Sequence, residues 1–241
     1  MKKLALIFTA SLSLAACSPS ATTSSLKTSV TDNATTTVSK TTTVSQTLPD
    51  NVKTAVFAGG CFWCMESDFE KLDGVFEAVS GYTGGRTDNP NYKTVSYTET
   101  GHYEAVEVTY DPSVVNYGQL LDYYWRHIDP TDPNGQFCDQ GSSYRTAVFA
   151  DASQIAAARQ SKNDIAVSKP FDGPVTTEIL PLSAFHIAEE YHQDYYKKNP
   201  AHYQRYRVGC RRDARLEQLW GKPATQNSKP VKSSGSYGSG K

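Results

Sequence analysis

Two cysteines follow a glycine pair directly after an apolar run, in the stretch Gly59-Gly60-Cys61-Phe62-Trp63-Cys64-Met65-Glu66. The apolar run at 52–58 predicts a strand, the glycines a tight turn, and Cys61 the start of a helix. A helix N-terminus carries unpaired N–H donors and the positive end of the helix dipole, so we expect the Cys61 thiol to be shifted toward the reactive thiolate. Cys64 lies about one helical turn away, within disulfide reach. The stretch therefore predicts a nucleophilic thiol with a second thiol beside it.

The length, charge and motifs of the chain exclude some classes of function. The chain has 241 residues and a net charge of −1, and no polybasic region suggests nucleic-acid binding. It shows no internal repeat and no glycine-rich phosphate motif. Aromatic residues make up 11% of the chain, which is enough for a sizeable core. These features predict one folded domain, at about residues 51–220.

Both ends of the chain are predicted to lie outside that domain. Lys2 and Lys3 precede a short apolar stretch at 4–14, a pattern typical of a signal peptide and too short to span a membrane. The ending Leu-Ala-Ala-Cys resembles a bacterial lipobox, which implies removal of residues 1–16 and lipidation of Cys17. Residues 17–50 are rich in Ser and Thr and predict a disordered tether, and 221–241 a disordered tail.

Within the domain, strands and helices alternate imperfectly. We predict strands at 52–58, 75–82, 102–110, 144–150 and 175–180, and helices at 62–72, 117–128, 152–168, 188–198 and 212–220. Residues 129–143 predict a long loop, a feature that is often functional in compact domains. The pattern favours an α+β sandwich with helices packed on a mixed sheet.

Cysteine spacing alone leaves three interpretations open. Besides Cys17 the chain has Cys61, Cys64, Cys138 and Cys210, which are compatible with a structural zinc site, two structural disulfides or redox catalysis at Cys61. Zinc sites usually show two close cysteine pairs, and here only one pair is close. A Cys-x-x-Cys near a strand–helix junction is also typical of thioredoxin-like proteins. However, Phe62 and Trp63 make an apolar lining that suits a small group such as a methyl on sulfur.

Several separated motifs occur in the order found in the A-type peptide-methionine sulfoxide reductases, and the chain resembles that family over nearly all of residues 54–220. The motifs are Gly-Cys-Phe-Trp at 60–63, Gly-Tyr-Thr-Gly-Gly at 81–85, Gly-His-Tyr-Glu-Ala-Val at 101–106, Tyr-Asp-Pro at 110–112, Asp-Gln-Gly-Ser-Ser-Tyr-Arg at 139–145 and Ala-Glu-Glu-Tyr-His-Gln at 188–193. The resemblance implies a two-layer α+β sandwich with a mixed sheet and a ferredoxin-like core. It also implies reduction of the S epimer of methionine sulfoxide.

The resemblance assigns roles to individual residues. Cys61 matches the nucleophile, and Glu104 matches the acid that supplies a proton or hydrogen bond to the sulfoxide oxygen, which requires burial to raise its pKa. Tyr82 and Tyr144 match family tyrosines whose hydroxyls bind the same oxygen. Asp139 matches a residue that helps to order the site. Phe62 and Trp63 match the pocket that receives the S-methyl group. Glu189 and His192 lie in a family-like helix and are interpreted as structural.

The implied reaction leaves Cys61 as a sulfenic acid, which a second thiol converts to a disulfide. Cys64 is a candidate resolving thiol by proximity, and Cys210 by its C-terminal position, either directly or as a relay; Cys138 is the weaker candidate. A thioredoxin-like donor would reduce the disulfide, with no metal, flavin or nucleotide cofactor.

The lipobox predicts a lipid anchor in the cell envelope. The resemblance implies an enzyme that reduces the sulfoxide both in oxidised proteins and in free methionine, and we expect it to be a monomer. Two other functions stay open at this point. A thiol–disulfide exchange protein would use Cys61 and Cys64 without Glu104, and a non-catalytic binding module would hold its cysteines in structural bridges.

Overall fold

The computed structural model describes residues 51–222. The predicted signal peptide, Cys17, the tether and most of the predicted tail lie outside the described residues. Within the described part of the chain, no helix is both long and apolar enough to cross a membrane.

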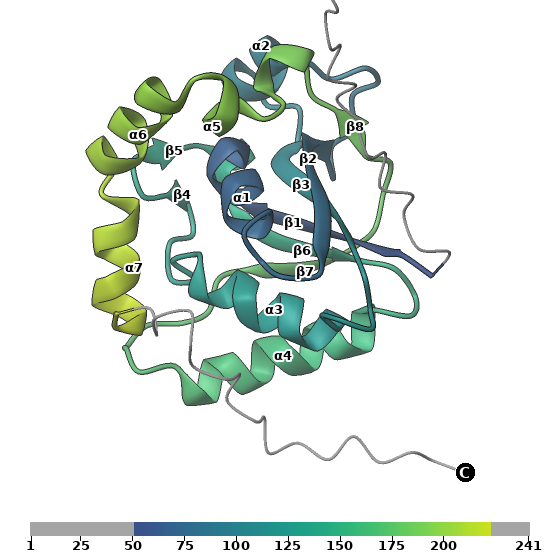
Figure 1. The fold of residues 1–241 in the computed structure, drawn as a ribbon, viewed down its shortest axis with the longest axis vertical. Helices are drawn as coiled ribbons and strands as arrows, with labels where there is room; N and C mark the ends of the chain where they lie inside the picture. Colours follow the sequence, from purple (N-terminus) through teal and green to yellow (C-terminus); the bar gives the residue numbers. More distant parts are fainter. Residues whose placement is uncertain (1–50, 223–241) are drawn as a thin grey trace, which may run out of the picture. The chain divides into compact units, whose positions relative to one another are not determined.

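A six-stranded mixed sheet organises the domain, in the strand order β7-β6-β1-β3-β2-β8 (Figure 1). Its strands are β1 (Lys53–Gly59), β2 (Val75–Thr83), β3 (Tyr103–Tyr110), β6 (Thr146–Ala150), β7 (Glu178–Pro181) and β8 (His186–Ile187). Only β6 and β7 pair in parallel; the other neighbours are antiparallel. The four central strands, in the order β6-β1-β3-β2 with α1 and α3 as crossovers, form a ferredoxin-like core, as predicted.

Seven α-helices accompany the sheet in residues 51–222: α1 (Phe62–Phe69), α2 (Tyr92–Tyr97), α3 (Tyr117–Arg126), α4 (Ile155–Ser168), α5 (Tyr195–Lys198), α6 (Pro200–Gly209) and α7 (Arg212–Trp220). Helix α3 begins with a capping box, in which the Asn116 side chain accepts from Gln119 N and the Gln119 side chain accepts from Asn116 N. Helices α6 and α7 follow one another along one side of the domain, next to the short β4–β5 hairpin (Figure 1).

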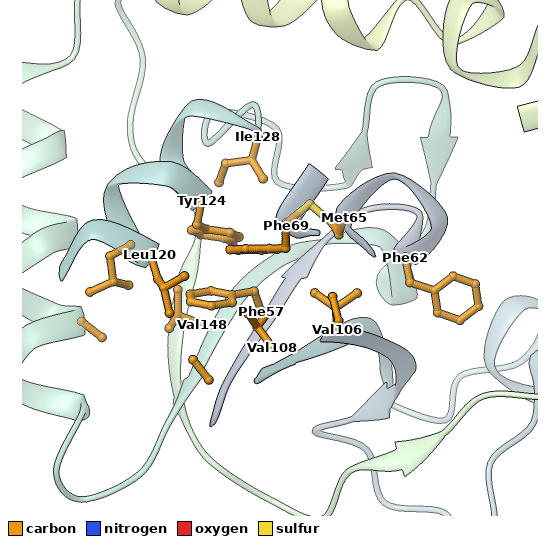
Figure 2. Close-up of a cluster of buried hydrophobic side chains, with 14 of the residues drawn as sticks. Phe57, Phe62, Met65, Phe69, Val106, Val108, Leu120, Tyr124, Ile128 and Val148 are labelled. Atoms are coloured by element: carbon orange, nitrogen blue, oxygen red, sulfur yellow. The ribbon is translucent and has the colours of Figure 1, made fainter. Parts of the chain in front are cut away.

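The main core lies between the sheet and the helices. Alternate residues of the strands, such as Phe57 and Val106, face α1 and α3, where Phe57 stacks on Phe69 at 4.9 Å and on Tyr124 at 5.1 Å (Figure 2). The opposite face buries a smaller cluster that includes Val56, Ala58, Ala105 and Phe149. This alternation decides where Glu104 points. It lies two residues before Val106 on β3 and therefore faces α1.

Two predicted elements differ from the structure. The loop at 129–143 contains a short hairpin of β4 (Gly135–Gln136) and β5 (Asp139–Gln140). The helix predicted at 188–198 is wrong. This segment makes a 3₁₀ turn at Glu190–His192, and α5 begins only after Asp194, whose left-handed backbone (φ 53°) interrupts any continuous helix.

Candidate active site

Cys61 occupies the N-cap of α1, at the mouth of a small cavity of about 50 Å³. The cavity is lined by Cys61, Phe62, Trp63, Tyr92, Glu104, Asp139, Tyr144 and Tyr206. Gly60 makes the turn between β1 and α1 with a φ of 82°, and a Cβ there would lie 2.5 Å from Gln136 Cβ. Only glycine allows both this backbone conformation and the close approach of the hairpin. The turn leaves Cys61 6% exposed, facing the cavity.

Glu104 meets Cys61 in this cavity from the neighbouring strand. Its side chain is buried, and its Oε2 accepts a hydrogen bond from Phe62 N at 3.1 Å. Burial raises the pKa of Glu104 to about 8, and the charge of Asp139 adds to the rise, although hydrogen bonds from Phe62 N and Tyr144 act against it. The carboxyl is therefore mostly protonated at neutral pH and can donate a proton.

The two thiols of the Cys-x-x-Cys stretch interact. Both are free and buried, and they share a hydrogen bond. Burial raises the pKa of Cys61 well above its usual value, and the contact with Cys64 adds to this. The same hydrogen bond, helped by the charges of Arg212 and Arg207, lowers the pKa of Cys64. The expectation that the helix N-terminus shifts Cys61 toward thiolate is wrong for the free enzyme, because desolvation outweighs the helix dipole.

Three tyrosines reach the cavity, and Tyr82 is not among them. Tyr92 and Tyr144 both line it, and Tyr206, which also lines it, donates to Asp139 Oδ2. Tyr82 is the cross-strand neighbour of Glu104, but its hydroxyl donates to Glu189 Oε2 at 2.9 Å. In the cavity, Tyr92 thus takes the place that the resemblance assigned to Tyr82.

Phe62 and Trp63 form the apolar wall of the cavity, as the sequence suggested. Trp63 stacks on Tyr195 with ring centroids 3.7 Å apart and an interplanar angle of 6°. Its indole N–H donates to His192 Nδ1 at 3.0 Å. Burial lowers the pKa of His192 to about 4, so the ring is neutral and its Nδ1 is available as an acceptor.

The segment around Glu189 ties the cavity wall to the sheet. One carboxylate oxygen of Glu189 accepts from Tyr92 N and the other from the Tyr82 hydroxyl, both at 2.9 Å. Glu189 thereby fixes the start of α2, which delivers Tyr92. Its role, like that of His192, is to hold residues that touch the cavity.

The remaining cysteines form one disulfide, Cys138–Cys210, which joins the β4–β5 hairpin to the end of α6. The structure thus separates the four cysteines into a free buried pair and a bridged pair, which does not fit a four-cysteine zinc site. Donor atoms of Cys138, Asp139 and Cys210 lie within 4.8 Å of one another, but a disulfide offers no thiolate to a metal. A second acidic group, Glu66, Glu70 and Asp194, is bound by Ser80, Tyr196 and Lys197.

Sequence reasoning missed Tyr92 and Tyr206. Tyr92 is the first residue of α2, and Asn91 before it forms a capping box with Thr94. The Asn-Pro-Asn-Tyr-Lys-Thr pattern carries that capping signal, although the helix has only six residues. Tyr206 lies on α6, which begins with Pro200 at its first position, a recognisable start signal. Neither signal indicates that the phenol faces Cys61.

This arrangement combines a nucleophilic sulfur, a protonated carboxyl and phenolic hydroxyls around a cavity with an apolar wall. Such a site can receive a small group that is apolar on one side and carries an oxygen acceptor on the other. Attack by Cys61 together with proton donation from Glu104 would transfer an oxygen from the bound group to sulfur. A methyl sulfoxide has these properties.

Comparison with known proteins agrees with this chemistry. A family model described as peptide methionine sulfoxide reductase matches residues 53–224. The chain is 54% identical over 169 residues to peptide methionine sulfoxide reductase MsrA 2 of Caulobacter vibrioides, covering 70% of this chain and 86% of that protein. It is 49% identical over 175 residues to MsrA of Bacillus subtilis, covering 72% and 99%.

Solved structures show the same fold. Methionine sulfoxide reductase A of Corynebacterium diphtheriae matches with a TM-score of 0.59 and 33% identity, over 63% of this chain and 77% of that one. The reduced form of Mxr1 from Saccharomyces cerevisiae matches with a TM-score of 0.59 and 33% identity, over 63% and 88%. The matched region contains every residue that lines the cavity. The chain is thus an enzyme, and it belongs to the peptide methionine sulfoxide reductase family.

Proposed function

We propose that the reduction of methionine sulfoxide, the reaction of this family, starts with attack of Cys61 on the sulfoxide sulfur. The observation that carries the proposal is the meeting of Cys61 and a protonated Glu104 at one cavity. Glu104 gives its proton to the sulfoxide oxygen as the Cys61 sulfur bonds to the substrate sulfur. The oxygen then passes to Cys61, methionine leaves, and Cys61 is oxidised to a sulfenic acid while the substrate is reduced.

The hydroxyls of Tyr92 and Tyr144 are proposed to hydrogen-bond the sulfoxide oxygen beside Glu104. The methyl group would lie against Phe62 and Trp63, on the apolar side of the cavity. With the oxygen at the two hydroxyls and the methyl group against the rings, one arrangement of the sulfoxide would present its sulfur to Cys61. This asymmetry supports selection of one epimer, which we propose is S.

Cys64 is proposed to resolve the sulfenic acid. It is in hydrogen-bond contact with Cys61 and is free, whereas the sulfur of Cys210 is bonded to Cys138. Cys64 attacks the Cys61 sulfur, the sulfur–oxygen bond breaks, and the oxygen leaves as hydroxide, which takes up a proton to become water. The product is a Cys61–Cys64 disulfide.

The second pair, Cys138 and Cys210, is proposed to carry electrons from the reductant. Cys61 and Cys64 are 6% and 2% exposed, so a protein donor has little access to a disulfide between them. Cys138 is exposed and Cys210 half-buried. A dithiol at 138 and 210 would reduce the buried disulfide by thiol exchange and become the bridge seen here, which a thioredoxin-like donor then reduces.

The site of action is proposed to be the cell envelope, with a lipid on Cys17 as the anchor. The support is the sequence pattern at residues 1–17, a charged start, a short apolar stretch and a lipobox-like ending. The enzyme, as a monomer, would then repair oxidised envelope proteins. Labelled fatty acid incorporated into the wild-type chain, and not into Cys17→Ser, would support this; label in neither protein would contradict it.

The experiment for the reaction is single-turnover reduction of the separate S and R epimers of a methionine sulfoxide peptide. Pre-reduced wild-type protein is compared with Cys61→Ser. We expect conversion of the S epimer alone and none by the variant. No conversion of either epimer by folded, reduced protein would overturn the proposal, and a thiol–disulfide exchange activity would then explain the two cysteines better.

A further inference from the structure

Two buried arginines approach α1 on the side that carries Cys64. Cys64 and Asp68 are four residues apart on α1 and therefore share a face. Asp68 Oδ1 lies 2.9 Å from Arg207 Nη1, and Asp68 Oδ2 lies 3.7 Å from Arg212 Nε. Arg212 Nη2 also lies 3.1 Å from the sulfur of Met65, the residue after Cys64. Both guanidinium groups thus lie against the part of α1 that carries Cys64, and their charges act on its thiol.

Arg212 is the less well paired of the two arginines. Arg207 donates three hydrogen bonds to Asp213, at 2.6–3.0 Å, and lies 2.9 Å from Asp68, whereas Arg212 Nε lies 3.7 Å from Asp68 Oδ2. The side chains of Arg212 and Arg207 are 2% and 10% exposed and that of Asp68 3%, whereas the second carboxylate, Asp213, is 61% exposed. Arg212 bonds the carbonyls of Gly59 and His127, which carry no net charge. Its Nε is buried without a hydrogen-bond partner among the described residues. A buried cation short of an anionic partner is costly, which favours a functional role.

A thiolate at Cys64 would give Arg212 a second anion, because Arg212 shares Asp68 with Arg207. The titratable groups near Cys64 are Cys61 at the N-cap of α1, Asp68 on α1, Glu104 on β3, Tyr203, Tyr206 and Arg207 on α6, and Arg212 on α7. Glu104 and the two phenols are neutral at pH 7, since burial raises their pKa values. The arginines therefore act on Asp68 and on the nearby sulfur.

We propose that Arg212, assisted by Arg207, stabilises the thiolate of Cys64 and so sets the rate at which Cys64 attacks the Cys61 sulfenic acid. The arginines are positioning residues for this second step and have no part in methionine release. The inference rests on the proposed role of Cys64. The step forms the Cys61–Cys64 sulfur–sulfur bond and breaks the sulfur–oxygen bond of Cys61, with hydroxide leaving.

The chain corner that carries these arginines also carries the second disulfide. Helix α6 ends at Cys210, Arg211 adopts a left-handed backbone (φ 56°), and α7 begins at Arg212. Cys210 therefore lies between the two arginines in sequence, and its disulfide to Cys138 ties their corner to the β4–β5 hairpin. Arg212 itself packs over the Phe137 ring, with the guanidinium carbon 4.5 Å from the ring centroid.

The test measures the two steps separately in the full chain, pre-reduced and mixed with a methionine sulfoxide peptide without a reductant. The amount of released methionine reports the first step. The second step is followed by the loss of free thiols, and any sulfenic acid that has not yet reacted with Cys64 is trapped with dimedone. For Arg212→Gln we expect methionine release within about 2-fold of wild type. The rate of the second step should fall by about 10-fold at pH 7, because raising the pKa of Cys64 by one unit removes about nine-tenths of its thiolate. The rate should recover at higher pH, where the Cys64 thiol is ionised again.

Matched variants keep the inference falsifiable. Arg212→Lys keeps the charge and should restore most of the rate. Asp68→Asn removes the carboxylate that competes with Cys64 for the arginines. The pH at which the rate of the second step is half-maximal should therefore move to lower values, in the direction opposite to the change in Arg212→Gln. If Arg212→Gln does not fold, Arg207→Gln provides the same measurement with a smaller shift. A wild-type pH profile for the second step in folded arginine variants would overturn the inference.

Cys64→Ser distinguishes failure of the arginine role from failure of the resolving role. It should release methionine and stop at the sulfenic acid. If it forms a disulfide at the wild-type rate, Cys64 does not resolve, and the proposed function of that residue fails together with this inference.

Discussion

The backbone N–H of Phe62 donates to Glu104 Oε2 across 3.1 Å, which joins the helix that begins after Cys61 to strand β3. A hydrogen bond from a helix N-terminus favours a carboxylate, whereas burial favours the neutral acid. Burial wins, because the pKa of Glu104 is raised to about 8. The contact therefore fixes where the acid lies without removing its proton, and nucleophile and proton donor face the same small cavity.

Glu104→Gln should abolish most of the first step while leaving the site filled. The amide can still accept from Phe62 N but has no proton of comparable acidity to give, so we expect methionine release to fall by about 10²–10⁴-fold. In wild type the protonated form is lost above pH 8, so the contribution of Glu104 should decline there. Stopped-flow single-turnover rates between pH 6 and pH 10 check both expectations. A variant with a wild-type rate at pH 7 would remove Glu104 from the reaction.

The same substitution should stabilise the fold at neutral pH. The pKa of Glu104 is raised from 4.5 to about 8, so the native state holds a proton that the unfolded state has lost between these values. Stability therefore falls as pH rises from 4.5 to 8, by about 1.4 kcal/mol per pH unit at most. Glu104→Gln removes this cost. We expect a gain of up to about 3 kcal/mol at pH 7 and little change at pH 4.5, measured by urea unfolding. An equal loss of stability at both pH values would contradict the assignment.

Tyr92→Phe and Tyr82→Phe form a matched pair that tests which phenol serves the cavity. Tyr92 lines it, whereas the Tyr82 hydroxyl is held by Glu189. We expect Tyr92→Phe to slow methionine release by about 10-fold or more, since a hydrogen bond to developing charge is lost. Tyr82→Phe should leave this rate within about 2-fold and lower stability by about 1–3 kcal/mol, since the Glu189 carboxylate loses a donor. The reverse pattern would return the role to Tyr82.

This pair also shows how far the sequence could predict the site. Strand and glycine signals placed Cys61 at the start of a helix, and the polar–apolar alternation along 102–110 predicted a strand there. Glu104 itself was assigned only by the family resemblance, because alternation alone would have left it facing solvent. The helix start and the strand are local patterns, so they could be predicted, whereas the burial of Glu104 depends on helix α1 packing against β3. The hydroxyl of Tyr82 is a different case. Its ring lies on the correct face of β2, but its terminal oxygen is captured by Glu189, more than a hundred residues away.

The predicted protonation state of Cys61 was wrong for a related reason. The helix dipole is a local effect that the sequence reveals, but burial of the thiol depends on α6, the β4–β5 hairpin and α2 closing over it. The helix predicted at 188–198 was wrong because hydrogen bonds to other elements hold this segment. Asp194 N donates to Glu66 Oε1 at 2.5 Å, and the Gln193 side chain bonds both Ser80 backbone groups. Such contacts between distant elements are not visible in local periodicity.

His192 should matter through Trp63. Its neutral Nδ1 accepts the indole N–H at 3.0 Å, and Trp63 forms part of the apolar wall. His192→Leu leaves the indole N–H without this acceptor, so we expect weaker substrate binding, seen as a several-fold higher KM with a smaller change in kcat. His192→Asn offers an oxygen near the Nδ1 position and should retain more of the affinity. Equal KM values for both variants and wild type would show that the hydrogen bond does not orient Trp63.

Loss of the Cys138–Cys210 disulfide should affect steady-state turnover and the single-turnover release of methionine differently. If this exposed pair passes electrons to the buried cysteines, Cys138→Ser and Cys210→Ser should both lose most turnover supported by a thioredoxin-like protein. Release of methionine in a single turnover should stay within about 2-fold of wild type, since neither sulfur reaches the substrate. The bridge spans 72 residues of sequence, so each oxidised variant should also be less stable by about 2–4 kcal/mol. A small dithiol such as dithiothreitol, which needs less access, should restore turnover in both variants. Unimpaired turnover with the protein donor in both variants would leave the bridge a purely structural role, because the donor would then be reducing the Cys61–Cys64 disulfide directly.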